Sequence, residues 1–110
     1  METKTVSSDD DIIVTSDDIL ELFDDIRAQI ETGIDKGWLA QRNMMYIKDI
    51  REMYVSEARF KSAGDGIDTI IHYVQQGESD APTEGDTRKL MSDLGILQSK
   101  LHKKSTYYSN

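Results

Sequence analysis

The stretch that decides the fold class is DDILELFDDIRAQIET, residues 17–32. Its large apolar residues recur at intervals of three and four, which places them in one stripe along an α-helix with the charged residues off the stripe. Asp17 is a good N-cap, and Gly33 or Gly37 supplies a left-handed stop. We therefore predict a helix over residues 17–32, with an apolar stripe made of Ile19, Leu22, Phe23, Ile26 and Ile30.

A second, longer helix is predicted from about Lys36 or Trp38 to about Ser62, where proline is absent. The sequence Ala63-Gly64-Asp65-Gly66 is then expected to break the chain, because glycine suits the positive φ angles of a turn. The apolar positions of this helix spread wider than one stripe, so we expect it to face two neighbours through Leu39, Met45 or Tyr46, Ile47, Ile50, Met53 or Tyr54, Ala58 and Phe60.

The remaining segments divide at a loop over residues 76–85, which holds the only proline. Residues 67–76 fit either a helix or a buried β-strand, and we favour the helix because no second strand is available to pair with it. The last helix is predicted from about Thr83 or Asp86 to about Lys104. Its seam has the spacing of a coiled coil, through Thr87, Leu90, Leu94, Leu97 and Leu101.

These segments predict an all-α fold, a small antiparallel helical bundle of three longer helices and one short one. A single bundle domain is expected over residues 15–104. It follows an acidic disordered lead-in over residues 1–14 and precedes a frayed tail over residues 105–110. The apolar core is thin for a chain of this size, so a seam shared with a second copy would add stability.

Composition limits the classes of function. The chain has 110 residues, no cysteine and a net charge of -8. The absence of cysteine excludes disulfides, thiolate zinc sites and thiol catalysis, and the acidic charge argues against a wholly basic nucleic-acid binder. No apolar run approaches the roughly 18 residues that span a bilayer, and the acidic N-terminus lacks the order of a signal peptide. We therefore expect a cytoplasmic protein without membrane contact.

The charge is arranged in blocks along the chain. Residues 1–35, 36–64, 65–86 and 87–110 carry net charges of -9, +3, -6 and +4. Adjacent helices of opposite charge show this alternation, because complementary faces lower the repulsion within an acidic molecule. Solvated helix faces and an acidic tail explain the same pattern.

The catalytic inventory is poor, so we predict neither an enzyme nor a cofactor, catalytic or metal site. His72 follows Asp68 by four residues and can share a helical face with it, yet a histidine hydrogen-bonded to such an aspartate is more often structural. Asp49 and Glu52 have the spacing of one magnesium-binding acidic pair, but a second pair is missing. No loop matches the calcium-binding pattern of an EF-hand.

The leading hypothesis is a non-catalytic helical interaction or assembly module that binds another protein and self-associates. Methionine and aromatic residues are enriched in protein interfaces, and the acidic residues concentrate on the helix at 17–32. The predicted partner-binding residues are Asp17, Asp18, Glu21, Asp24, Asp25, Trp38, Met45, Tyr46, Met53 and Tyr54. The predicted self-association residues are Leu90, Leu94, Leu97 and Leu101, which can equally fill the core of one chain.

Two alternatives remain open. Eight carboxylates within residues 9–25 can imitate the phosphates of a nucleic acid, which describes an inhibitor that occupies the basic groove of a DNA- or RNA-binding protein. A metal-dependent hydrolase of the helical-bundle type is the second alternative. The basic tail, Lys100 to Lys104 followed by Tyr107 and Tyr108, is weak evidence for nucleic-acid contact, and we do not expect direct binding.

Overall fold

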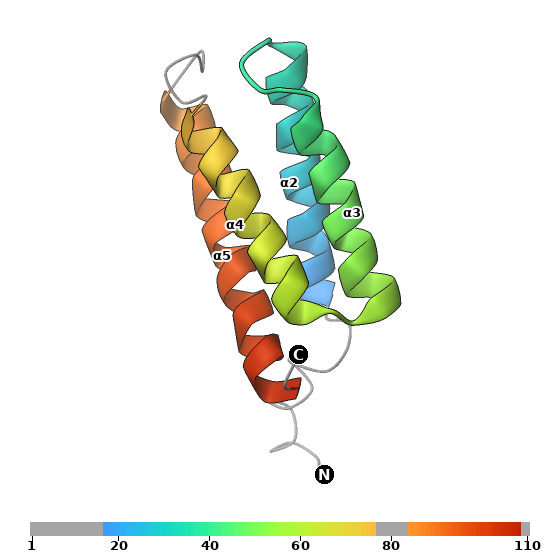
Figure 1. The fold of residues 1–110 in the computed structure, drawn as a ribbon. Helices are drawn as coiled ribbons and strands as arrows, with labels where there is room; N and C mark the ends of the chain where they lie inside the picture. The colour runs from blue at the N-terminus through green and yellow to red at the C-terminus, as the bar shows by residue number, and fades with distance from the viewer. Residues whose placement is uncertain (1–16, 77–83, 109–110) are drawn as a thin grey trace.

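The computed structural model describes residues 17–76 and 84–108, which form four helices and no strand. This part of the chain confirms the all-α fold. The helices are α2 (Asp17–Asp35), α3 (Arg42–Glu57), α4 (Phe60–Gln76) and α5 (Glu84–Tyr108). Figure 1 shows the chain running one way along α2 and α4 and the opposite way along α3 and α5.

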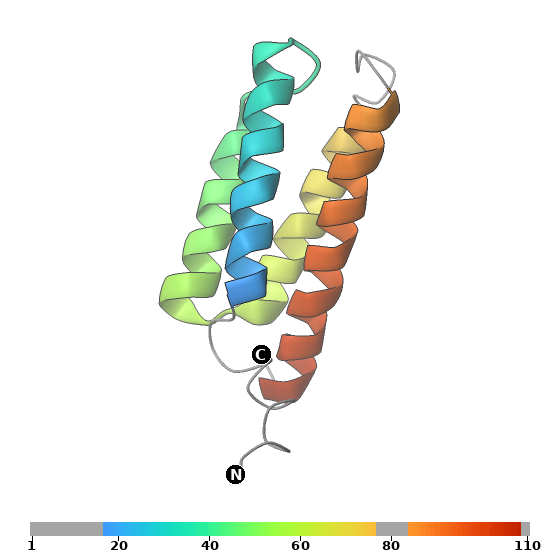
Figure 2. The same cartoon turned by 180° about the vertical axis from the view of Figure 1, so that it is seen from behind.

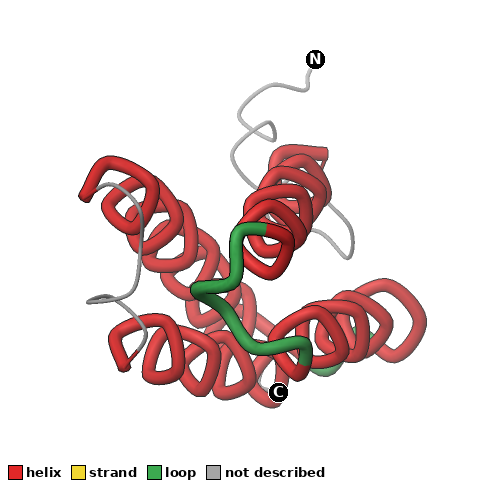
Figure 3. The backbone as a smooth tube through the Cα atoms, turned by 90° about the horizontal axis from the view of Figure 1, so that it is seen from above, coloured by secondary structure: helices red, strands yellow, loops and turns green. Residues whose placement is uncertain are grey.

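The four helices enclose one apolar core. Seen from above in Figure 3, they stand around a common centre, with α2 beside α3 and α5, and α4 beside the same two helices. The stripe predicted on α2 faces this centre, although Leu22 is only half-buried. The core takes its buried side chains from all four helices: Ile19, Phe23, Ile26, Ile30, Met44, Ile47, Ile50, Tyr54, Phe60, Ala63, Ile67, Ile70, Val74, Leu90, Leu94, Leu97 and Leu101.

The prediction of one helix to Ser62 with a turn at residues 63–66 is wrong. α3 ends at Glu57, and Ala58 takes the left-handed conformation with φ 52° and ψ 36°. The Arg59 N–H donates to the Met53 carbonyl at 3.2 Å and closes the helix end. The segment at 67–76 is helical, as favoured, but its helix begins seven residues earlier, at Phe60.

The glycines that suggested a turn lie inside α4 and serve helix packing instead. A Cβ built at Gly66 would lie 2.7 Å from the side chain of Ile50 on α3. A Cβ built at Gly64 would lie 3.3 Å from the ring of His102 on α5. The absence of a side chain at both positions therefore lets the neighbouring helices approach α4 closely.

The connection between α2 and α3 folds back over the end of α2. Gly37, with φ 85°, makes the reversal, while Gly33 remains inside a helix that continues to Asp35. The N–H groups of Trp38 and Leu39 donate to the Gly33 carbonyl at 3.0 and 3.2 Å. Both side chains are buried, which places the single tryptophan in the bundle.

α5 continues to Tyr108, so residues 105–108 of the predicted tail belong to the helix. The predicted lead-in at 1–14 and most of the predicted loop at 76–85 lie outside the described residues. None of the helices described here has the length and apolar character needed to cross a membrane.

Candidate interaction face between α2 and α5

α2 and α5 lie side by side and run in opposite directions, as seen from behind in Figure 2. Polar contacts join them near Gln29 and near Asp18. The Gln29 amide donates to Asp93 Oδ2 at 2.7 Å, and the Lys100 ammonium meets Asp18 Oδ2 at 2.7 Å. We call the surface around these contacts the α2–α5 face; its residues are Asp18, Leu22, Asp25, Ala28, Gln29, Thr32, Lys89, Asp93, Ile96 and Lys100.

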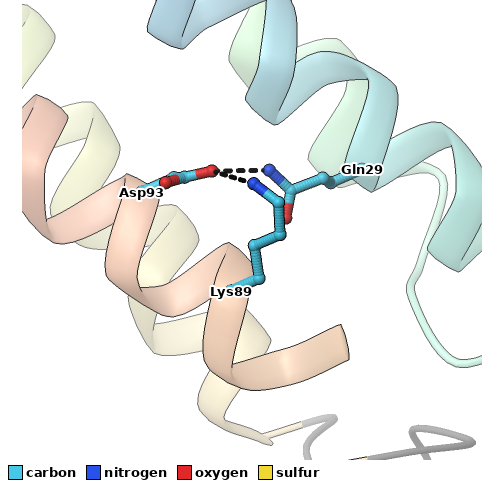
Figure 4. A network of polar contacts seen from close by, with 3 residues as sticks. All are labelled: Gln29, Lys89 and Asp93. Atoms are coloured by element: carbon cyan, nitrogen blue, oxygen red, sulfur yellow. Dashed lines mark hydrogen bonds and ion pairs between the residues drawn. The ribbon is translucent and has the colours of Figure 1, made fainter. Parts of the chain in front are cut away.

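The upper contact is a three-residue network. Figure 4 shows Gln29 and Lys89 pointing at the same carboxylate, that of Asp93. The Lys89 ammonium lies 3.2 Å from Asp93 Oδ2, one helical turn away on α5. The side chain of Asp93 is mostly buried, so both donors compensate a carboxylate that has lost much of its water.

The lower contact changes the acidity of Asp18. The hydrogen bond from Lys100 lowers the pKa of the Asp18 carboxyl below its ordinary value, and partial burial opposes this effect. Both side chains remain partly exposed, so the pair contributes little to stability. The pair links the start of α2 to the last third of α5.

An apolar step lies between the two contacts. Asp93, Ile96 and Lys100 follow at intervals of three and four, so they share the flank of α5 that faces α2. Asp18 and Lys100 are in contact, and the two helices are antiparallel. Leu22 follows Asp18 by four residues and Ile96 precedes Lys100 by four, so Leu22 and Ile96 lie at the same level. Ile96 is 44% exposed and Leu22 is half-buried. The α2–α5 face thus carries two apolar side chains between the Gln29–Asp93 and Asp18–Lys100 contacts.

A pocket of about 220 Å³ opens above the Gln29–Asp93 contact. The pocket is lined from α2, from α5 and from the loop between α2 and α3, by Ala28, Gln29, Thr32, Gly33, Gly85, Lys89, Leu90 and Trp38. Trp38 is 6% exposed, and its Nε1–H has no hydrogen-bond partner among the described residues. A buried donor without an acceptor costs about 1–3 kcal/mol.

A buried lysine lies in the core near the lower contact. Lys104 is fully buried, with its ammonium 5.5 Å from the Phe60 ring centre and 6.0 Å from that of Tyr54. Desolvation lowers the pKa of Lys104, and the negative charge of Asp18 partly offsets this. The sequence places Lys104 in a basic run, but the structure places it in the core with its aromatic neighbours.

The predicted acidic partner residues divide into two groups. Asp18 and Asp24 form ion pairs within the chain, with Lys100 and Arg51 respectively. Glu21 and Asp25 are exposed, and the structure records no ion pair for either in residues 17–76 and 84–108. Asp17 is the first residue of α2, and the structure does not describe its side chain.

The predicted partner residues around α3 are scattered. Trp38 and Tyr54 are buried, so the expectation that they form a surface is wrong. Tyr46 stacks on Tyr73 of α4 at 5.8 Å, and Met53 is half-buried. Of these five predicted residues, Met45 alone is exposed, at 61%, and it lies on the surface of α3 away from the core.

The four leucines of the predicted self-association seam belong to the core of one chain. Leu90, Leu94, Leu97 and Leu101 are each 0% exposed. A second copy cannot reach them unless the bundle opens. The spacing therefore marks the inner face of α5, which was the other interpretation of the same pattern.

The candidate catalytic pair is not assembled into a site. Asp68 and His72 are both exposed, and Asp68 Oδ1 accepts a hydrogen bond from Gln98 at 2.8 Å. Asp49 and Glu52 are exposed on α3. Within residues 17–76 and 84–108, no three acidic or histidine side chains converge to hold a metal ion.

The residues of the α2–α5 face that were not predicted from the sequence include Gln29, Lys89, Asp93 and Ile96. On a helical projection these residues flank the buried stripes of α2 and α5, and that position is typical of the edge of a helix interface.

Comparisons of the chain with family models, with curated proteins and with solved structures give no match.

Proposed function

We propose that this protein is a non-catalytic helical interaction module and that the α2–α5 face binds a protein partner. The observation that carries the proposal is the exposed side chain of Ile96. It lies at the level of Leu22, between the Gln29–Asp93 hydrogen bond and the Asp18–Lys100 ion pair. An apolar centre with a polar rim is the common anatomy of a protein interface. Within this chain, polar contacts between the two helices lie on either side of the apolar centre.

The charges around the face suggest what the partner offers. On the α2 side, Glu21 and Asp25 are exposed. On the α5 side, Lys103 is exposed, while Lys89 and Lys100 already meet carboxylates of this chain. The fitting partner therefore carries an apolar anchor with basic groups toward α2, and its association weakens as salt rises.

The acidic nucleic-acid mimic receives less support. Such a mimic needs a row of uncompensated carboxylates, whereas Asp18 and Asp24 are paired within the chain. The hypothesis uses four acids on α2 after its first residue; all four are exposed, and the described structure records ion pairs for two of them. They fit the rim of a mixed interface better than a full imitation of phosphates.

The test is affinity capture from the native host with three baits: the unmodified protein, Ile96→Glu and Met45→Glu. Both variants place a charge at an exposed helix position, and circular dichroism verifies that both remain folded. The proposal expects a partner that the unmodified protein and Met45→Glu retain and that Ile96→Glu loses by at least tenfold. A partner retained by Ile96→Glu and lost by Met45→Glu would place the interface on α3 instead.

A further inference from the structure

We propose that the outer face of α3 binds a second copy of this chain, with the two α3 helices packed antiparallel about a two-fold axis near Ile50. In the bundle, α3 packs beside α2 and α4, and α5 stands diagonally across the core from it (Figure 3). This surface is therefore separate from the α2–α5 face, and the inference does not rest on the partner proposed above. It rests on the exposure, the spacing and the charges of one row of side chains.

The row runs along the solvent side of α3. We call it the α3 stripe; its residues are Met45, Lys48, Glu52 and Val55. They follow one another at intervals of three, four and three, which places them on one face of the helix, and all four are exposed. Met45 is 61% exposed and Val55 is 38% exposed. The stripe thus has an apolar side chain at each end and two opposite charges between them.

The α3 stripe is complementary to its own reverse. The midpoint of the stripe is Ile50, with Lys48 and Glu52 two residues away on either side and Met45 and Val55 five residues away. Two identical helices related by a two-fold axis and running antiparallel bring each residue level with the one equally far beyond the midpoint. Met45 of one copy then meets Val55 of the second, and Lys48 meets Glu52. A parallel pair would place each charge against its own copy, which is repulsive, so the charges select the antiparallel arrangement.

The two charges of the α3 stripe are available for a second copy. Lys48 makes no ion pair within the part of the chain that the structure describes. The carboxylate of Glu52 accepts a hydrogen bond from the Ser56 hydroxyl one turn later, and no cation meets it among the described residues. Arg51, which lies on the flank of the stripe toward α2, is instead paired with Asp24. Contact with a second copy therefore adds ion pairs without breaking those already made.

The contact is short, so the dimer is weak and reversible. α3 has 16 residues, which span about 24 Å. One helix pair of this length covers less than the roughly 1,200 Å² of a stable interface. Asp49 also lies beside the stripe near the axis, where it meets its own copy and opposes association. We expect a dissociation constant of about 100 micromolar.

Charge reversal tests the pairing directly. Sedimentation equilibrium of the unmodified chain, from about 10 micromolar to about 1 millimolar, should show the dimer form. Lys48→Glu leaves only carboxylates at the centre of the stripe, and Glu52→Lys leaves only ammonium groups. Each variant alone should dimerise about tenfold more weakly or worse, because like charges meet at both central levels. An equimolar mixture of the two variants should dimerise about as tightly as the unmodified chain, because opposite charges meet again.

Matched variants and the mixture decide the outcome. Asp49→Asn removes a carboxylate of the same helix that has no mate across the axis, so it should dimerise at least as tightly as the unmodified chain. Glu52→Gln should dimerise more weakly. The proposal is wrong if the unmodified chain stays monomeric throughout the range, if Lys48→Glu dimerises as well as the unmodified chain, or if the mixture associates no better than its components. Self-association that Ile96→Glu loses and Lys48→Glu keeps would place the contact on the α2–α5 face, and capture of another protein there is scored separately.

Discussion

Replacing Ala58 with glycine tests where the chain turns between α3 and α4. Ala58 is the non-glycine residue with a positive φ in the described structure. The left-handed conformation costs an L-residue about 1–2 kcal/mol, a cost that glycine does not bear. Glycine loses more backbone entropy on folding, by about 0.4–1 kcal/mol, and the half-buried Ala58 methyl also packs against the core. The net of these terms is small, and we expect Ala58→Gly to stabilise the protein by about 0–1 kcal/mol.

The sign of the change separates two structures. If residue 58 lay inside a continuous helix to Ser62, glycine would destabilise the protein by about 1 kcal/mol. Ala28→Gly is the matched control, because Ala28 is an exposed residue inside α2. Urea denaturation followed by far-UV circular dichroism gives both free energies of unfolding. A loss of stability in Ala58→Gly equal to that in Ala28→Gly would refute the turn at this residue.

Three further outcomes follow from burial and charge. Leu94→Asp should lower the free energy of unfolding by about 3–5 kcal/mol or more, because it buries an unpaired charge; a folded monomer of unchanged stability would favour the surface seam instead. Because the pKa of Asp18 is lowered in the folded protein, the Asp18 carboxylate stabilises the protein above its ordinary pKa, and this stabilisation is lost as pH falls through the lowered pKa. The free energy of unfolding of Asp18→Asn should not show this loss in an acid titration. The lowered pKa of Lys104 means that the unfolded chain binds more protons between that value and 10.5, so stability should rise with pH in this window. Lys104→Met should abolish the rise, and Lys103→Met, at an exposed neighbour, should keep it.

The sequence predicts the helices well where the pattern is local. The stripe over 17–32 and the leucines of α5 follow the helical period, and both face the core. The break between α3 and α4 could not be predicted in the same way. Ala58 is an ordinary helix former, whereas Gly64 and Gly66 resemble a turn until their contacts with His102 and Ile50 are known. Those contacts join different helices, which local patterns do not encode.

The candidate face was less predictable than the core. Tryptophan is a residue type typical of interfaces. The loop that carries Trp38 is bonded to the Gly33 carbonyl, however, and the Trp38 side chain is buried. Ile96 lies beside the leucine seam, and its exposure depends on how α2 packs against α5. Asp93 gains its partners from α2 as well as from its own helix. Residues at the edge of a helix interface are defined by the neighbouring helix, which a single sequence does not supply.

Photo-crosslinking within the native host tests the α2–α5 face most directly. A benzophenone side chain is introduced at position 96 in one sample and at position 45 in another, since both positions are exposed on different helices. We predict a crosslink from position 96 to one partner protein and none to that partner from position 45. A crosslink to the partner from position 45 alone would contradict the assignment of the face.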